Sequence, residues 1–304
     1  MNKPKVYIDG QAGTTGLEIY ARLSKRKDIE LIQIDENLRK NPLERKKLMN
    51  QADLVFLCLP DQASKEAMTL ITNPQTKVID ASTAHRTNEN WVYGMSELSL
   101  EHKQKIQSHH FVANPGCHAT GFIMSVYPLI QSQIISPSTI LSCFSLTGYS
   151  GGGKKMIQQY EQEKKHELYA PRIYGLNQNH KHLAEMKKIC GLEHEPIFNP
   201  IVDDYYRGMA TTITIDGHDK KEVYDILSSW YKDSPLISVY MQEEGMISAN
   251  IKEQTDSLDI IVYGNNTRVC VTCLFDNLGK GACGAAIQNM NLMLGFDELE
   301  GLHI

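Results

Sequence analysis

The stretch KVYIDGQAGTTG, residues 5–16, decides the fold class of this chain. Residues 5–9 form a short apolar segment typical of a β-strand, and apolar residues with helical spacing begin directly after it. Three glycines between them form the pattern G-x-x-G-x-x-G. Glycines allow a tight turn and close approach to a pyrophosphate, and the helix N-terminus then offers backbone N–H groups to it. This pattern predicts a dinucleotide-binding turn rather than an ordinary glycine-rich turn. The residues expected to contact the cofactor there are Gly10, Gly13, Thr14, Thr15 and Gly16.

Strand and helix patterns alternate through the rest of the N-terminal part. Apolar strand patterns recur at 29–35, 52–60 and 77–82, and residues 64–72 fit a helix. Strands that alternate with helices indicate a parallel sheet with right-handed crossovers. We therefore expect an α/β fold that begins with a Rossmann-type dinucleotide-binding domain over residues 1–114.

The pattern changes after this first domain. Strand patterns at 139–154 and 209–216 are followed by two strands that flank Asn265-Asn266, which is typical of a hairpin. Successive strands joined by close turns indicate a mixed or antiparallel sheet. We predict an α+β catalytic and oligomerisation domain over 115–275, and a C-terminal helix over 276–304 that returns to the first domain.

Composition narrows the classes of protein. The 304 residues carry a net charge of −5, which argues against a protein that coats nucleic acid. No segment approaches the about 20 consecutive apolar residues of a membrane-spanning helix, and the N-terminus lacks an apolar signal core. The seven scattered cysteines therefore suggest reduced thiols in a cytoplasmic protein. Cys270 and Cys273 lie in a strand pattern that points them to opposite faces, so we expect no metal site.

The segment ANPGCHATG, residues 113–121, contains the candidate nucleophile, Cys117. A helix pattern follows it, and a helix N-terminus stabilises a thiolate through its dipole and its free N–H groups. The alternative is a buried cysteine that merely begins a helix. A cysteine nucleophile also needs a proton carrier, and His180 and His182 in NQNHKHLAEM are the candidates. Residues two apart do not share a helix face, so a metal pair there is disfavoured.

The choice between NAD and NADP stays open. Asp35 ends the second strand, where an acid usually binds a ribose hydroxyl and favours NAD. Arg39 and Lys40 follow and suit a 2′-phosphate. Alternatively, Asp35 caps the helix that follows.

Several motifs together resemble one known family. DASTAHRT, VYGMSEL, NPGC, TGYSGGGK, HKH and DNLGKGACGAAIQNMNLMLG occur in this order along the chain, which resembles the shorter form of N-acetyl-γ-glutamyl-phosphate reductase of arginine biosynthesis. The likeness covers nearly the whole chain, and aspartate-semialdehyde dehydrogenase is similar more distantly.

The resemblance implies NADPH-dependent reduction of an acyl phosphate, N-acetyl-L-glutamyl 5-phosphate, to an aldehyde with release of phosphate. It assigns the nucleophile to Cys117 and the histidine to His180 or His182, and it favours a homo-oligomer. It also places near the nicotinamide a C-terminal segment that includes Asn277, Lys280 and Gly281. The chain departs from the family at His118 and Ala119, where Tyr-Pro is expected, and at Ala184, where proline is expected.

Substrate phosphate and carboxylate groups need cations and N–H donors. Arg86 is the first choice because its planar guanidinium suits phosphate oxygens, unless it pairs with a nearby acid. Ser150 and Gly151 belong to a glycine-rich loop that either presents donors to the substrate or is a flexible hairpin. Two other functions compete with this interpretation: a semialdehyde dehydrogenase for another acyl phosphate, and a non-catalytic dinucleotide-binding regulator. A cysteine hydrolase is disfavoured because it has no use for a phosphate-binding turn.

Overall fold

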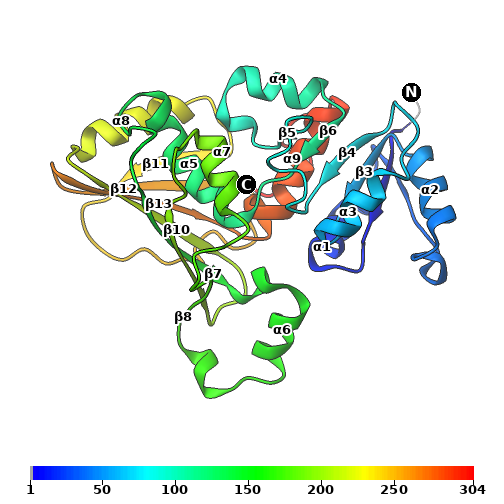
Figure 1. Cartoon of the computed structure of the whole chain (residues 1–304), viewed down its shortest axis with the longest axis horizontal. Coiled ribbons are helices and arrows are strands. Elements are labelled where there is room, and N and C mark those ends of the chain that lie inside the picture. The colour runs from blue at the N-terminus through cyan, green and yellow to red at the C-terminus, as the bar shows by residue number, and fades with distance from the viewer. Residues whose placement is uncertain (1–2) are drawn as a thin grey trace. The chain divides into compact units, whose positions relative to one another are not determined.

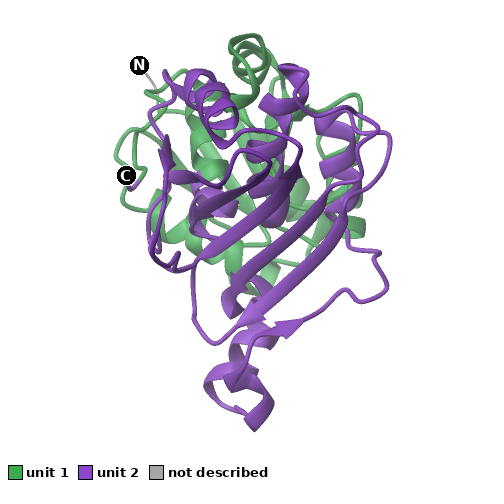
Figure 2. Ribbon diagram, turned by 90° about the vertical axis from the view of Figure 1, so that its left-hand side faces the viewer, with its two compact units in different colours: residues 1–115, 285–302 green, residues 116–284, 303–304 purple. Residues whose placement is uncertain are grey.

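The computed structural model describes residues 3–304, which form two compact units (Figure 2). The first unit comprises the described residues up to Pro115 together with Ala285–Leu302, and the second comprises Gly116–Gly284 with His303–Ile304. The boundary before the C-terminal segment lies between Gly284 and Ala285, later than the expected one at 275/276. The intervening segment packs within the second unit: a Cβ added at Gly279 would meet the Thr255 carbonyl oxygen, and one added at Gly281 would lie 3.0 Å from Cys117 Cβ.

The first unit contains a six-stranded parallel sheet, which confirms the expected α/β class (Figure 1). Its order is β2-β1-β3-β4-β6-β5, so the first strand lies inside the sheet and is buried on both sides. The strands are β1 (Lys5–Asp9), β2 (Glu30–Ile32), β3 (Leu54–Leu57), β4 (Lys77–Asp80), β5 (Val92–Tyr93) and β6 (Phe111–Ala113).

Helices connect these strands in the manner of a doubly wound sheet. The helical segments of this unit are α1 (Thr14–Leu23), η1 (Glu36–Leu38), α2 (Pro42–Gln51), α3 (Asp61–Met68), η2 (Ser96–Leu98), α4 (Leu100–Ser108) and most of α9 (Gly284–Leu294). The start of α2 is well defined because the Asn41 side chain accepts from two backbone N–H groups and Pro42 occupies the first turn. The helix predicted at 64–72 begins earlier, at Asp61, and ends at Met68.

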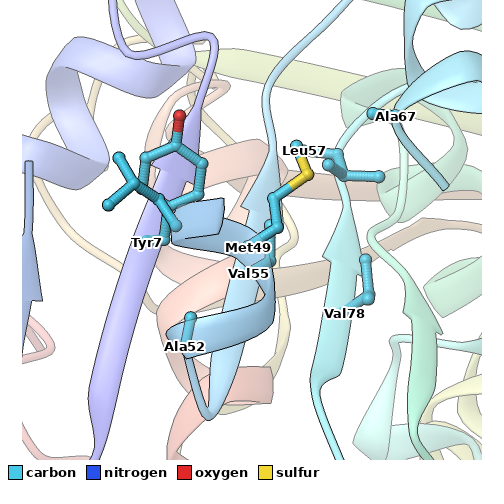
Figure 3. Close-up of a cluster of buried hydrophobic side chains, with 8 residues drawn as sticks. Tyr7, Met49, Ala52, Val55, Leu57, Ala67 and Val78 are labelled. Carbon is cyan, nitrogen blue, oxygen red and sulfur yellow. The ribbon is translucent and has the colours of Figure 1, made fainter. Parts of the chain in front are cut away.

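A cluster of buried side chains forms one part of the core of this unit (Figure 3). Tyr7, Val55 and Val78 come from neighbouring strands, while Met49 and Ala67 come from α2 and α3. All five side chains are almost fully buried. The cluster fixes the strand edge from which the loops after β1 and β3 emerge.

The second unit is built on a seven-stranded mixed sheet of order β11-β12-β13-β10-β7-β9-β8. Its strands are β7 (Ser142–Gly148), β8 (Arg172–Ile173), β9 (Ile197–Asp203), β10 (Met209–Asp216), β11 (Ile237–Met241), β12 (Leu258–Gly264) and β13 (Arg268–Phe275). The predicted hairpin is confirmed, because β12 and β13 pair antiparallel around Asn265-Asn266. Two pairs, β7 with β9 and β11 with β12, are parallel.

The helical segments of the second unit include one almost wholly buried helix, α5. They are α5 (Cys117–Gln131), η3 (Tyr149–Gly152), α6 (Gly153–Glu161), η4 (His166–Tyr169), α7 (Leu183–Cys190), α8 (Lys220–Tyr231) and η5 (Gly279–Cys283). α5 lies against β10 and β13. A side chain at Gly121 would meet Thr211 of β10 at 2.5 Å, so the close approach of helix and sheet requires glycine there. The sheet thereby fixes the start of α5, where Cys117 lies.

Among residues 3–304, no helix is both long enough and apolar enough to cross a membrane.

Candidate functional site

The glycine turn after β1 has the geometry that a dinucleotide needs. Gly10 has a φ of +86°, and a Cβ there would lie 2.3 Å from the carbonyl oxygen of Cys58. A Cβ at Gly16 would lie 2.5 Å from the carbonyl oxygen of Gly10. Thr14 and Thr15 begin α1, and Gly13 precedes it without a side-chain cap. The first N–H groups of α1 are therefore placed to bind an anion.

A cavity of about 800 Å³ opens beside this turn. Gly10, Arg39, Lys40 and Arg45 are among its lining residues, so cationic groups border a space of cofactor size. Arg45 also binds Asp9 at the end of β1, with an N–O distance of 2.6 Å. The residues present therefore fit a dinucleotide with its phosphates at the turn.

Asp35 takes the capping role that the sequence left open. Its carboxylate accepts a hydrogen bond from Asn37 N–H at 2.8 Å and caps η1. The Arg39 guanidinium lies 3.6 Å from Glu36, and half of the Arg39 side chain is exposed. The positively charged side chain of Arg39 therefore borders the cavity, in the segment that follows β2.

Cys117 is the first residue of α5, and Gly116 precedes it without a side-chain cap. Cys117 is half-buried, whereas burial raises the pKa values of the Cys143, Cys190 and Cys273 thiols. Position and exposure together separate Cys117 from these three cysteines.

Three histidine rings lie together close to the start of α5. The centroid of His118 is 5.7 Å from that of His180 and 5.6 Å from that of His182, and the latter two are 4.8 Å apart. Burial, with a smaller effect of Lys181, lowers the pKa of His180 to about 4. His180 Nδ1 accepts from the His182 backbone N–H at 3.3 Å. In the neutral imidazole the proton therefore resides on Nε2.

Glu185 was missed in the sequence and joins this group. One of its carboxylate oxygens accepts from Gly116 N–H at 3.2 Å, and the other lies 3.9 Å from His182 Nε2. The carboxylate is almost fully buried. Its spacing from His182, three residues along α7, was the signal in the sequence, because such residues share a helix face.

Two loops of the second unit meet through Asn277. Its side chain donates to Ser150 Oγ at 2.9 Å and accepts from Gly208 N–H at 2.9 Å. A Cβ added at Gly151 would lie 3.6 Å from Asn277 Nδ2, so Gly151 lies beside the same side chain. The structure thus brings together two predicted substrate residues and one predicted cofactor residue.

Gly281 lies directly against the candidate nucleophile. A Cβ at Gly281 would be 3.0 Å from Cys117 Cβ. Lys280, beside it in η5, is buried. The segment assigned to the cofactor therefore contributes to the surroundings of Cys117.

Arg86 belongs to the first unit and is largely buried. Its Nε donates to the Asn114 carbonyl at 2.9 Å, and its Nη2 donates to the Ala81 carbonyl at 3.1 Å. These contacts fix the guanidinium against the backbone of the first unit.

Within residues 3–304, no three His, Cys, Asp or Glu side chains are grouped to hold a metal ion.

Comparisons with known proteins place this site in a family. Residues 117–277 match the dimerisation domain of semialdehyde dehydrogenases, and residues 31–106 match their NAD binding domain. N-acetyl-γ-glutamyl-phosphate reductase 2 of Nostoc sp. is 42% identical over 99% of this chain and 100% of that protein. The Pseudomonas putida protein with the same description is 38% identical over 99% of this chain and 100% of its own.

Solved structures share the fold. Aspartate semialdehyde dehydrogenase II of Vibrio cholerae, complexed with ASA, has a TM-score of 0.73 at 13% identity, covering 97% of this chain and 99% of its own. Aspartate semialdehyde dehydrogenase of Candida albicans with NADP has a TM-score of 0.66 at 14% identity, covering 96% and 98%. At such identities the likeness concerns the fold alone. The close relatives decide the family, and this chain belongs to the N-acetyl-γ-glutamyl-phosphate reductases.

Proposed function

We propose that this protein reduces N-acetyl-L-glutamyl 5-phosphate to the corresponding semialdehyde with NADPH and releases phosphate, as a step of arginine biosynthesis. Two relatives that are 42% and 38% identical to this chain are named after this reaction, and the match covers their whole lengths. The observation in the structure that carries the proposal is Cys117 at the uncapped start of α5, beside two histidines and a buried glutamate.

The reaction begins at the Cys117 sulfur. The thiolate attacks the acyl carbon, the carbon–oxygen bond to phosphate breaks, and a thioester forms on Cys117. Backbone N–H groups at the start of α5 stabilise the negative charge on the carbonyl oxygen. After reduction, the thiohemiacetal collapses, so that the aldehyde leaves and the thiolate returns.

NADPH, when bound, supplies the hydride for this reduction. The turn at Gly10, Gly13 and Gly16 holds its pyrophosphate, and Arg39 binds its 2′-phosphate. Asn277, Lys280 and Gly281 are retained as the proposed residues at its nicotinamide end.

His180 is our choice for the histidine that acts on the reacting oxygen. It is half-buried, its Nδ1 accepts from a backbone N–H, and its neutral form donates a hydrogen bond from Nε2–H to the thiohemiacetal oxyanion, which stabilises the negative charge until the aldehyde leaves. His182 is buried and faces Glu185, which suits a residue that fixes the start of α7. Arg86, Ser150 and Gly151 remain the proposed substrate-binding residues.

The proposal extends to the oligomeric state of the protein and to its cellular compartment. The segment 117–277 matches a dimerisation domain, so we propose a homo-oligomer built through the second unit, with the first unit as the dinucleotide-binding domain. All seven cysteines are present as thiols, which supports a reducing compartment such as the cytoplasm.

The test replaces Cys117 with serine and measures phosphate-dependent oxidation of the semialdehyde with NADP. We expect kcat/KM to fall by at least about 10³-fold, or about 4 kcal/mol, because the covalent path is lost. Cys270→Ser is the matched control, since Cys270 is another half-buried cysteine of the same unit. Activity of the Cys117 variant within tenfold of the parent would overturn the proposal.

Two further measurements separate the competing functions. Activity with the aspartyl substrate that exceeds activity with the N-acetylglutamyl substrate would identify another semialdehyde dehydrogenase. A regulator that only binds the dinucleotide would lack a thiol that reacts with iodoacetamide well below the ordinary cysteine pKa of about 8.5.

A further inference from the structure

Arg45 of α2 is held in one position at the end of β1. Its Nη2 donates to Asp9 Oδ2 at 2.6 Å, and its Nε donates to Asp9 Oδ1 at 3.2 Å. Two hydrogen bonds of this kind fix the plane of a guanidinium as well as its position. The Asp9 side chain is 5% exposed and the Arg45 side chain is 18% exposed. The pair is therefore a largely buried, bidentate ion pair rather than a loose surface contact.

The third nitrogen of this guanidinium is left for another partner. Among residues 3–304, Arg45 Nη1 has no hydrogen-bond acceptor, and it remains accessible to solvent. The N–H groups of an arginine are strong donors that carry positive charge. Arg45 also lines the cavity of about 800 Å³ that opens beside Gly10. The free edge of the guanidinium is thus available to an anion in the cofactor cavity.

The charges that border this cavity favour a phosphate group. Arg39, Lys40 and Arg45 are its cationic lining residues, and Glu36 and Asp9 are its acidic ones, so positive charge is in excess. The Arg39 guanidinium lies 3.6 Å from Glu36, and half of the Arg39 side chain is exposed. Arg39 is therefore the less constrained of the two arginines.

The position of Arg45 in the fold indicates which phosphate it meets. The start of α1 supplies backbone N–H groups for the pyrophosphate. The adenosine ribose of a dinucleotide lies beside the residues that follow the second strand of such a domain. Gln33 and Ile34 follow β2 and line the cavity together with Arg45. The carboxylate of the next residue, Asp35, is engaged with Asn37 N–H, so it is not directed at a ribose hydroxyl.

We propose that Arg45 is a cofactor-specificity residue: held by Asp9, it donates from Nη1 to the 2′-phosphate of NADPH and shares that phosphate with Arg39. The inference rests on the proposed use of NADPH. Asp9 is the positioning residue of this site, because a guanidinium that is already fixed loses little conformational freedom when the phosphate binds.

The test measures binding of cofactor fragments, so that it needs no reductase activity. Isothermal titration calorimetry gives the Kd of 2′,5′-ADP, which carries the 2′-phosphate, and of 5′-AMP, which lacks it. The central variant is Asp9→Asn/Arg45→Gln, in which two neutral amides replace the ion pair. Its net charge equals that of the parent, and no buried carboxylate is left without a partner. Lys46→Gln is the matched control, because Lys46 is an exposed cation of the same helix that does not line the cavity.

We expect the double variant to bind 2′,5′-ADP about tenfold more weakly and 5′-AMP within about twofold of the parent, because a charge-assisted hydrogen bond to the 2′-phosphate is lost. Arg45→Lys should weaken 2′,5′-ADP binding about fivefold, since one ammonium group cannot hold Asp9 at two points and also present a fixed donor to the phosphate. Lys46→Gln should stay within about twofold of the parent for both fragments.

Parental affinity for 2′,5′-ADP in the folded double variant would overturn the inference and leave Arg45 as a residue that only neutralises Asp9. Equal losses for the two fragments would overturn it as well, because Arg45 would then act on a group that both fragments share. If the double variant fails to fold, Arg45→Lys decides the question, and parental affinity there refutes the role of the fixed guanidinium. Failure of the proposed function is distinguishable: a parent that prefers 2′,5′-ADP but lacks reductase activity would contradict the reaction and leave this site in place.

Discussion

Replacing Gly281 with alanine should slow the enzyme by crowding Cys117, the proposed nucleophile. The new methyl group would lie 3.0 Å from Cys117 Cβ, 3.1 Å from the Asp276 carbonyl oxygen and 3.2 Å from Phe275 Cε2. The Asp276 oxygen is fixed by its hydrogen bond from Gly281 N–H at 2.9 Å, and the Phe275 ring is fully buried. The η5 segment and the start of α5 must therefore move apart.

The size of the effect follows from these distances. Unstrained carbon atoms approach to about 3.5 Å, so a contact of 3.0 Å requires a shift of about 0.5 Å between η5 and Cys117. Overpacking of this kind costs about 1–3 kcal/mol of stability. A misplacement of about 1 Å at a reacting group costs about 10²-fold in rate, so half of it should lower kcat about tenfold, or about 1.4 kcal/mol.

The assay compares kcat, the alkylation rate of Cys117 and the unfolding temperature with a matched control. Gly217→Ala is that control: Gly217 has a φ of +79°, and no atom lies within 4 Å of its added Cβ. The left-handed backbone costs an alanine about 1–2 kcal/mol, so stability falls without crowding near Cys117. Parental kcat and parental alkylation in a folded Gly281→Ala enzyme would refute the reasoning.

Three other outcomes are expected. Arg39→Ala should raise KM for NADPH about tenfold and leave KM for NADH unchanged, because Arg39 lines the cofactor cavity and is proposed to bind the 2′-phosphate that NADH lacks. An equal change of the two KM values in initial-rate assays would contradict this. Glu185→Gln should lower kcat about tenfold, because its carboxylate holds both Gly116 N–H and His182, and an unchanged kcat would remove Glu185 from the site. The folded-state pKa of His118, about 3, lies below its unfolded value, so the unfolded chain binds more protons below about pH 6.5. Urea unfolding should therefore show that the parent loses about 2 kcal/mol more than His118→Gln between pH 7 and pH 5.

Local apolar patterns were sufficient to predict the central elements of the fold. Lys5–Asp9 and Met209–Asp216 have the predicted bounds, because both are continuous runs of strand-forming residues inside a sheet. The second strand is shorter than predicted: only Glu30–Ile32 pairs with β1, at the edge of the sheet. α2 was missed because its sequence is mostly polar and only Leu48 and Met49 are buried.

Those features of the candidate site that lie within a single segment of sequence could be predicted. The glycine turn and the cysteine at a helix start are signals within one segment each. The contacts of Tyr174 and Glu185 with this site were not predicted, since they depend on the residue after β8 and the first turn of α7 lying beside the start of α5. Such proximity arises from tertiary packing, which no local spacing reports.

The cysteines show how the fold, rather than the residue type, decides reactivity. Cys143 on β7 and Cys273 on β13 face packed side chains, and burial raises their pKa values far enough to keep them protonated at neutral pH. Cys117 has the same side chain, but it begins a helix whose first N–H groups no side chain caps, and a glycine on its other side leaves space at the sulfur-bearing carbon. Because a helix start favours the anion and a buried strand disfavours it, we expect the same thiol to be a nucleophile at Cys117 and an inert core group at Cys143 and Cys273.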